Sequence, residues 1–467
     1  MMDGLGNCLR RQGLSGLHAA VRSELRKDCF MAKYYEPMLF AGTSRHPNNM
    51  GMMAVLQEPV DGELLGEVAE SLRERFPYFY VRAELSGNEL IAVPNPLPIT
   101  VRNTWEPTFL HSKEVNYHMT TFKYEGNSFA MEMSHVISDG SGAIPYFKSV
   151  LYLYLSRKTG IEFDPAGFRL PGDPISENET GDPFPSLNLD AIPEPFYTKK
   201  VTSDFYDIHA KLADKLKKGK NIFLKIPEEK VMEICQDSDG SPNVLLSVLL
   251  AKAVRRMDPE SDKTVLIGVS VNHKAVLGNY DSYHLLSDVV YLDFPKNREN
   301  ESLEKMCTIA RGQLMLQVQP ENSMNYVKTM QSGADLLDIL PLPLRSAMTD
   351  LALDFVSRGT VCVSYPNLRS LGPLDPYIRE IFYLSEPDAF DVQIEAACIN
   401  GSFCLVFAQS FLSEVFFEAF CQELEAAGIP VEIIRKDSCP LSGVRFDGIE
   451  EEKQEKLKAF FKKVFQH

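Results

Sequence analysis

The sequence predicts an α/β protein of two lobes, each a mixed sheet with helices packed on it. Three observations lead to this class. At 467 residues, with 44% hydrophobic side chains, the chain is longer than one hydrophobic core usually serves. Alternating strand and helix patterns occur in both halves. A stretch rich in Pro, Asp, Glu, Asn and Ser separates the halves at residues 171–195, and we expect a linker there.

In the first half, Asp61 can cap a helix whose apolar stripe ends before Pro77. Ser86-Gly87-Asn88 has the chemistry of a hairpin turn between two strands. The strands expected before the central motif lie at 52–57, 79–85, 89–93 and 117–124.

The central motif is Ser134-His135-Val136-Ile137-Ser138-Asp139-Gly140, where a strand passes into a polar loop and a helical period starts at Ile144. His135 has the strand parity of Met131 and Met133, so we expect its imidazole to point inward and to be sheltered. A neutral imidazole in a desolvated site is an effective general base. Asp139 can fix the loop, and Gly140 lets the backbone approach a ligand. The structural alternative is a buried histidine bonded to a backbone carbonyl.

The second half repeats the pattern of the first. Asn400-Gly401 is a strong signal for a type I′ hairpin. Residues 1–30 are expected to form a flexible leader, with translation starting at Met1 or Met31, and 436–467 a tail with an amphipathic helix. The strands predicted are 222–226, 265–271, 285–293, 360–365, 393–399, 403–409 and 429–434, and the helices are 228–235, 242–254 and 413–427.

Composition excludes several classes of protein. The net charge of -16 disfavours a nucleic-acid partner, because such proteins cluster Lys and Arg. The nine cysteines have neither Cys-x-x-Cys pairing nor metal-site spacing, so we expect reduced thiols, no metal and a cytoplasmic protein. No run of 18 apolar residues occurs, which disfavours a membrane span.

His135, Asp139 and Gly140 have the spacing of the His-x-x-x-Asp-Gly motif, and the chain here resembles the CoA-dependent acyltransferase superfamily. That superfamily includes chloramphenicol acetyltransferases, peptide-synthetase condensation domains, plant acyltransferases and alcohol acetyltransferases. The segments ERFPYFYVRAEL and ACINGSFCLVFAQSFLSEVFFEAFCQELEAAGIPVEI are similar to alcohol acetyltransferase-like proteins, so the resemblance covers roughly residues 31–435. Ser134 stands where condensation domains have a second histidine, and Trp105 is the single tryptophan, whereas plant members carry one in a C-terminal motif.

The resemblance implies two chloramphenicol-acetyltransferase-like lobes, 31–170 and 196–435, with an active-site channel between them. His135 would deprotonate an acceptor that attacks a thioester carbonyl, without an acyl-enzyme. Asp139 would hold the loop by pairing with an arginine.

Oxyanion donors would come from the backbone near Gly140, or from Ser364 and Asn367 in the second lobe. His273 and His284 could border the channel.

The resulting hypothesis is a CoA-dependent O- or N-acyltransferase that uses acyl-CoA as a co-substrate and a small-molecule alcohol or amine as acceptor, with no bound cofactor. Condensation on carrier-protein thioesters and a non-catalytic binding protein of the same fold are the alternatives. The acceptor, the acyl chain length and the oligomeric state stay open.

Overall fold

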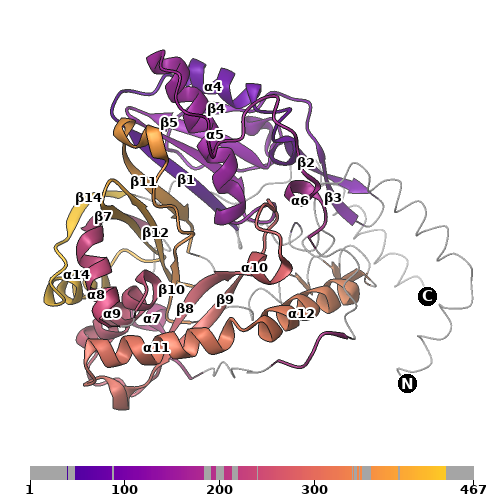
Figure 1. The fold of residues 1–467 in the computed structure, drawn as a ribbon. Helices are drawn as coiled ribbons and strands as arrows, with labels where there is room; N and C mark the ends of the chain where they lie inside the picture. Colours follow the sequence, from indigo (N-terminus) through magenta and orange to yellow (C-terminus); the bar gives the residue numbers. More distant parts are fainter. Residues whose placement is uncertain are drawn as a thin grey trace, which may run out of the picture.

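The computed structural model describes residues 39, 48–86, 89–183, 191–195, 204–212, 219–238, 240–338, 340, 344–345, 348–349, 359–387 and 390–437. These residues form two lobes, each built on its own large sheet (Figure 1). The predicted leader 1–30, the turn residues Gly87-Asn88 and the tail beyond Asp437 lie outside the described residues.

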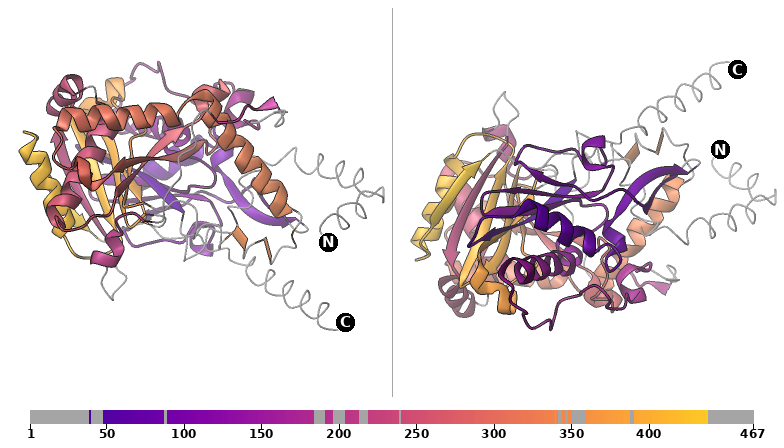
Figure 2. Two further views of the ribbon diagram at one scale, coloured as in Figure 1. Left: turned by 90° about the horizontal axis from the view of Figure 1, so that it is seen from below. Right: turned by 90° about the horizontal axis from the view of Figure 1, so that it is seen from above.

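The first sheet has five strands in the order β11-β1-β6-β5-β4, and only the β4·β5 pair is parallel. Its strands are β1 (Asn49–Leu56), β4 (Val101–Asn103), β5 (Thr120–Glu125), β6 (Ser128–Ser134) and β11 (Ile378–Ser385). Helices α4 (Gly62–Ser71) and α5 (Gly140–Thr159) pack together on one face (Figure 2). The Phe129 ring of β6 lies 5.9 Å from those of Phe147 and Tyr154 in α5. A separate hairpin pairs β2 (Val81–Ser86) with β3 (Glu89–Pro94).

Strand β11 comes from the second half of the chain but completes the first sheet. It pairs with β1 so that Ser385 lies opposite Met50, which in turn lies opposite Met133 of β6. The expected division at residues 171–195 does not account for this exchange. An apolar strand has the same sequence pattern whichever sheet it joins, so its place depends on contacts that are distant in sequence.

The second sheet has seven strands in the order β14-β7-β13-β12-β10-β8-β9. Strand β10 is parallel to both of its neighbours, and the other pairs are antiparallel, so the sheet is mixed. The two-lobed α/β architecture confirms the predicted fold class. The strands are β7 (Lys220–Pro227), β8 (Val265–Asn272), β9 (Ser287–Phe294), β10 (Val361–Ser364), β12 (Val392–Ile399), β13 (Ser402–Gln409) and β14 (Glu432–Asp437).

Helices cover the outer face of the second sheet, where its apolar side chains form one core cluster with theirs. The helices there are α8 (Glu228–Asp237), α9 (Pro242–Met257), α11 (Leu303–Gln317) and α14 (Val415–Ala426). The other helices in the second half are α7 (Ile208–Leu212), α10 (Lys274–Leu277) and α12 (Pro320–Asp338). Asn400 and Gly401 join β12 to β13 with φ values of 50° and 72°, which confirms the predicted turn because type I′ needs positive φ at both positions.

The inner face of the second sheet is divided in two. Along β7 and β13 it packs against the first lobe, where the Phe223 ring lies 5.1 Å from that of Phe382 in β11. Along β10 and β12 it carries half-buried polar side chains, among them Ser364 opposite Glu395. One part of this face is therefore core, and the other is a polar surface beside the junction of the lobes.

Candidate functional site

Strand β6 delivers the central motif to the junction of the lobes. The strand is buried along its whole length, and α5 starts at Gly140, directly after the Asp139 cap. The helix therefore begins four residues before the apolar period at Ile144 that the sequence showed.

The His135 imidazole is half-buried, which makes it more accessible than its strand parity predicted. Its backbone N–H donates to the Asn48 carbonyl at 2.8 Å, and the chain then turns away from the strand. Within the described part of the protein, no side chain or backbone group bonds to the ring. The imidazole is therefore free to take a proton from a ligand.

Asp139 joins the two lobes through its carboxylate. One oxygen, Oδ1, accepts from the Gly142 N–H and the Ser141 hydroxyl, both at 2.7 Å, and so caps α5. The other, Oδ2, accepts from the Leu286 N–H of the second lobe at 3.0 Å. Among the described residues no arginine pairs with Asp139. N–H and O–H donors take the role that the resemblance gave to an arginine.

Residues 283–286, directly before β9, pack against the motif loop and the start of α5. A Cβ on Gly142 would lie 2.5 Å from the Tyr283 carbonyl oxygen, so this close approach requires glycine. Tyr78 donates to the Ile137 carbonyl inside the motif, and its hydroxyl lies 3.2 Å from Nδ1 of His284. On its other side, Nε2 of His284 lies 3.0 Å from the Thr180 carbonyl.

His284 thus supports the motif loop through Tyr78. Its side chain is buried, both of its ring nitrogens are used, and burial lowers its pKa.

Part of the predicted linker is packed into the same region. Within it, α6 (Glu177–Thr180) starts at a capping box on Ser176. The Glu179 carboxylate is buried, with Arg75 at 2.7 Å and the Tyr283 hydroxyl at 2.6 Å. The segment therefore ties the first lobe to the residues that hold the motif.

The strand end with Ser364 lies against the start of α5. A Cβ on Gly140 would lie 2.8 Å from Cγ of Pro366, so the two segments touch. Ser364 is half-buried beside this contact, whereas Asn367 is exposed in a left-handed turn with φ of 64°. The structure thus brings Pro366, two residues after Ser364, against the motif and leaves Asn367 at the surface.

Sequence reasoning missed Glu395, which lies opposite Ser364 on the inner face. Its carboxyl accepts from the Ser364 hydroxyl and lies near the hydroxyl of Ser385, and burial raises its pKa to about 7. The hydroxyl of Tyr383, a residue only 4% exposed, has no hydrogen-bond partner among the described residues. Glu395 is the single charged residue in strand β12, and this isolated charge in an otherwise uncharged strand is the sequence feature that could have identified it.

His273 is also buried at the junction, at the end of β8. Its ring stacks on that of Tyr326 at 4.7 Å, and burial lowers its pKa to about 4. Neither ring nitrogen has a partner within the described residues. The described residues contain no group of three side chains able to hold a metal.

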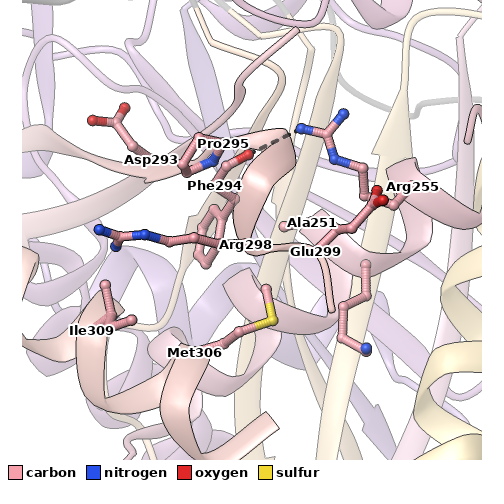
Figure 3. Close-up of a pocket in the computed structure, with 10 residues that line it drawn as sticks. Ala251, Arg255, Asp293, Phe294, Pro295, Arg298, Glu299, Met306 and Ile309 are labelled. Atoms are coloured by element: carbon pink, nitrogen blue, oxygen red, sulfur yellow. Dashed lines mark hydrogen bonds between the residues drawn. The ribbon is translucent and has the colours of Figure 1, made fainter. Parts of the chain in front are cut away.

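A small surface pocket lies elsewhere, on the helical side of the second sheet (Figure 3). It opens between α9, α11 and the end of β9, with Phe294 and Met306 in its apolar lining. Arg255 at its edge donates to the Phe294 carbonyl at 3.1 Å and so serves the fold. No residue of this pocket belongs to the motif. No described helix is long and apolar enough to cross a membrane.

Neither the protein-family models nor the curated proteins contain a match to this sequence. Solved structures do match. TRI101 of F. graminearum, in complex with coenzyme A and T-2 mycotoxin, is 12% identical with a TM-score of 0.54, over 86% of this chain and 98% of that one. Polyketide synthase associated protein 5 from Mycobacterium tuberculosis is 12% identical with a TM-score of 0.54, over 85% and 98%.

The epimerization domain from the third module of tyrocidine synthetase B is 12% identical with a TM-score of 0.50, over 84% of this chain and 94% of that one. At such identities the similarity concerns the fold alone. The chain thus shares the two-lobed fold of TRI101 and of polyketide synthase associated protein 5.

Proposed function

We propose that the protein transfers an acyl group from acyl-CoA to an alcohol or amine, with His135 as general base. The observation that carries the proposal is the half-exposed His135 imidazole, free of protein partners among the described residues, next to a loop that Asp139 anchors to the second lobe. A base must be held in position and yet keep its lone pair for the substrate, and this arrangement meets both needs.

In the proposed reaction the imidazole takes the proton of the acceptor O–H or N–H while the acceptor atom attacks the thioester carbonyl. The tetrahedral intermediate then collapses, the C–S bond breaks, and the CoA thiolate takes the proton from the imidazolium. Backbone N–H groups near Gly140, at the start of α5, are the proposed donors to the oxyanion, because the single hydrogen of the Ser364 hydroxyl is directed to Glu395. No acyl-enzyme forms, and no bound cofactor takes part. A cytoplasmic location belongs to the same proposal.

Two alternatives differ in the donor or in the chemistry. A carrier-protein thioester could replace acyl-CoA, since the tyrocidine epimerization domain has the same fold. A binding protein of this fold would need no free base. The accessible His135 ring favours catalysis over that second reading.

The test measures release of free thiol from acetyl-CoA and longer acyl-CoAs with a pooled panel of alcohols and amines. We expect acceptor-dependent release that falls about a hundredfold or more in His135→Ala. His209→Ala is the matched control, because this histidine is exposed and pairs with Asp391 far from the motif. Equal rates in the wild type and His135→Ala would refute the role of His135, and release only from a carrier-bound thioester would favour the first alternative.

A further inference from the structure

The glutamates that the structure buries fully have cationic partners. Glu132 lies 2.7 Å from Lys123, and Glu179 lies 2.7 Å from Arg75. In the second lobe, the ion pairs are Glu380 with Lys225 at 3.1 Å and Glu423 with Arg256 at 2.6 Å. This is the expected pattern, because an unpaired carboxylate is costly to remove from water.

Glu395 does not follow this pattern. Its polar neighbours are two neutral hydroxyls, from Ser364 and Ser385, and within the described residues no cation pairs with it. Protein surrounds the carboxyl closely enough for burial to raise its pKa to about 7, yet the side chain keeps some accessible surface. An ionised carboxylate has about four acceptor positions, so at least two remain for a ligand.

The surroundings of Glu395 are polar and adjoin the motif. The buried Tyr383 hydroxyl, without a described partner, lies close enough for the charges of Glu395 and Asp139 to act on it. The Tyr383 ring would lie 3.7 Å from a Cβ on Gly140. A group bound there would therefore sit between the start of α5 and the inner face of the second sheet.

We propose that Glu395 determines acceptor specificity by pairing with a cationic group of the acyl acceptor, such as a protonated amine separate from the atom that is acylated. The acceptor would then belong to the class of amino alcohols, diamines or polyamines. The cation remains intact in the reaction, and Tyr383 can donate to a neighbouring oxygen of the ligand. The net charge of -16 also favours the approach of a cationic molecule.

This inference rests on the proposed acyl transfer, and its experiment separates the two. Acceptors are compared in matched pairs, an amino alcohol against the alcohol of equal length that lacks the amine, with wild type, Glu395→Gln and His135→Ala. We expect Glu395→Gln to raise KM for the amino alcohol about ten- to a hundredfold, with kcat and the neutral alcohol changed less than about threefold. His135→Ala should abolish transfer to both.

The matched control is Asp288→Asn. Asp288 is another carboxyl in the same sheet whose pKa burial raises to about 7, but it lies opposite Val271, on the outer face with the helices. The control should leave KM for both acceptors unchanged. An equal KM increase in Asp288→Asn, or equal loss of both acceptors in Glu395→Gln, would overturn the inference while acyl transfer stood.

A binding measurement decides the inference without turnover. Calorimetric titration of the same amino alcohol into the wild type with coenzyme A present should show binding that Glu395→Gln weakens about tenfold or more. Equal binding in both proteins would refute the pairing. A wild type that binds the amino alcohol through Glu395 but transfers no acyl group to it would refute the proposed reaction and keep the cation site.

Discussion

On the motif side of the lobe junction, Asp139 accepts from two N–H groups and a hydroxyl, and Glu179 faces a guanidinium. On the sheet side, the polar neighbours of Glu395 are serine hydroxyls, and no described cation pairs with it. The first arrangement is complete without a ligand and holds the loop in one position. The second arrangement leaves the Glu395 carboxylate without a cationic partner among the described residues, and a cationic ligand can supply one. The degree to which a buried charge is satisfied thus separates a structural carboxylate from a binding one.

The largest effect is expected on the motif side, for Glu179→Ala. The change leaves the Arg75 guanidinium buried without its carboxylate, so the free energy of unfolding should fall by about 3–5 kcal/mol. Urea unfolding measures this value. Glu177→Ala, an exposed position on the same helix, is the control and should change stability by less than about 0.5 kcal/mol. If both variants lowered the free energy of unfolding by less than about 0.5 kcal/mol, the Glu179 carboxylate would not be the structural one that the comparison with Glu395 requires.

Asp139→Asn should lower the free energy of unfolding by about 2 kcal/mol. One oxygen can still cap α5, but the amide would turn an N–H group toward the Leu286 N–H. Ser141→Ala removes one hydroxyl and keeps both backbone bonds, so its effect should stay below about 1 kcal/mol. Urea unfolding of the three proteins tests the order, and an Asn variant as stable as the wild type would show that the carboxylate charge is dispensable.

Glu395→Gln should have the opposite sign at high pH. In the folded protein the pKa of Glu395 rises from its ordinary 4.5 to about 7, so between these values the folded state holds a proton that the unfolded state has released. The stability contributed by the protonated form is complete below about pH 4.5 and is lost as pH rises through 7. Above pH 8, Glu395→Gln should be more stable than the wild type by on the order of 2 kcal/mol.

Unfolding at pH 4.5 and pH 8.5 measures this difference, with Asp139→Asn as the comparison. The Asn variant should be less stable than the wild type at pH 8.5, where the Gln variant is more stable. A Gln variant that loses stability at pH 8.5 would mean that the folded protein already compensates the Glu395 charge.

The smallest effects concern two buried hydroxyls. Tyr78→Phe removes the bond to the Ile137 carbonyl and should cost about 1 kcal/mol. Tyr383→Phe removes a hydroxyl without a described partner and should change stability by less than about 0.5 kcal/mol, with a slight gain as the expected sign. Thermal unfolding at constant pH compares them. A larger loss for Tyr383→Phe would reveal a bound partner at that hydroxyl.

Local chemistry explains which parts were predictable from the sequence. The order of strand, loop and helix around His135 follows from apolar periods, although the helix begins at Gly140 and not near Ile144. The Asn400-Gly401 turn follows from the positive φ that both residues tolerate. These signals lie within a few residues of one another. They need no information about the rest of the fold.

The remaining features depend on contacts that are distant in sequence. The partner of Asp139 is the backbone N–H of Leu286, which any residue other than proline could supply, so no side-chain pattern marks it. The role of His284 depends on Tyr78 from the other lobe. Ser385, in strand β11, lies near Glu395, and the sequence around Glu395 does not reveal this distant neighbour.

The placement of β11 also affects the order of events during synthesis. Its residues pair with β1 across more than 300 positions of chain, as for Ser385 with Met50. At a translation rate of about 10 residues per second, β11 is synthesised roughly half a minute after β1, and until then this edge of β1 is unpaired. An open apolar strand invites pairing with other chains during that time. We expect the nascent chain to need a chaperone, or a temporary cover for this edge, until residue 385 has emerged.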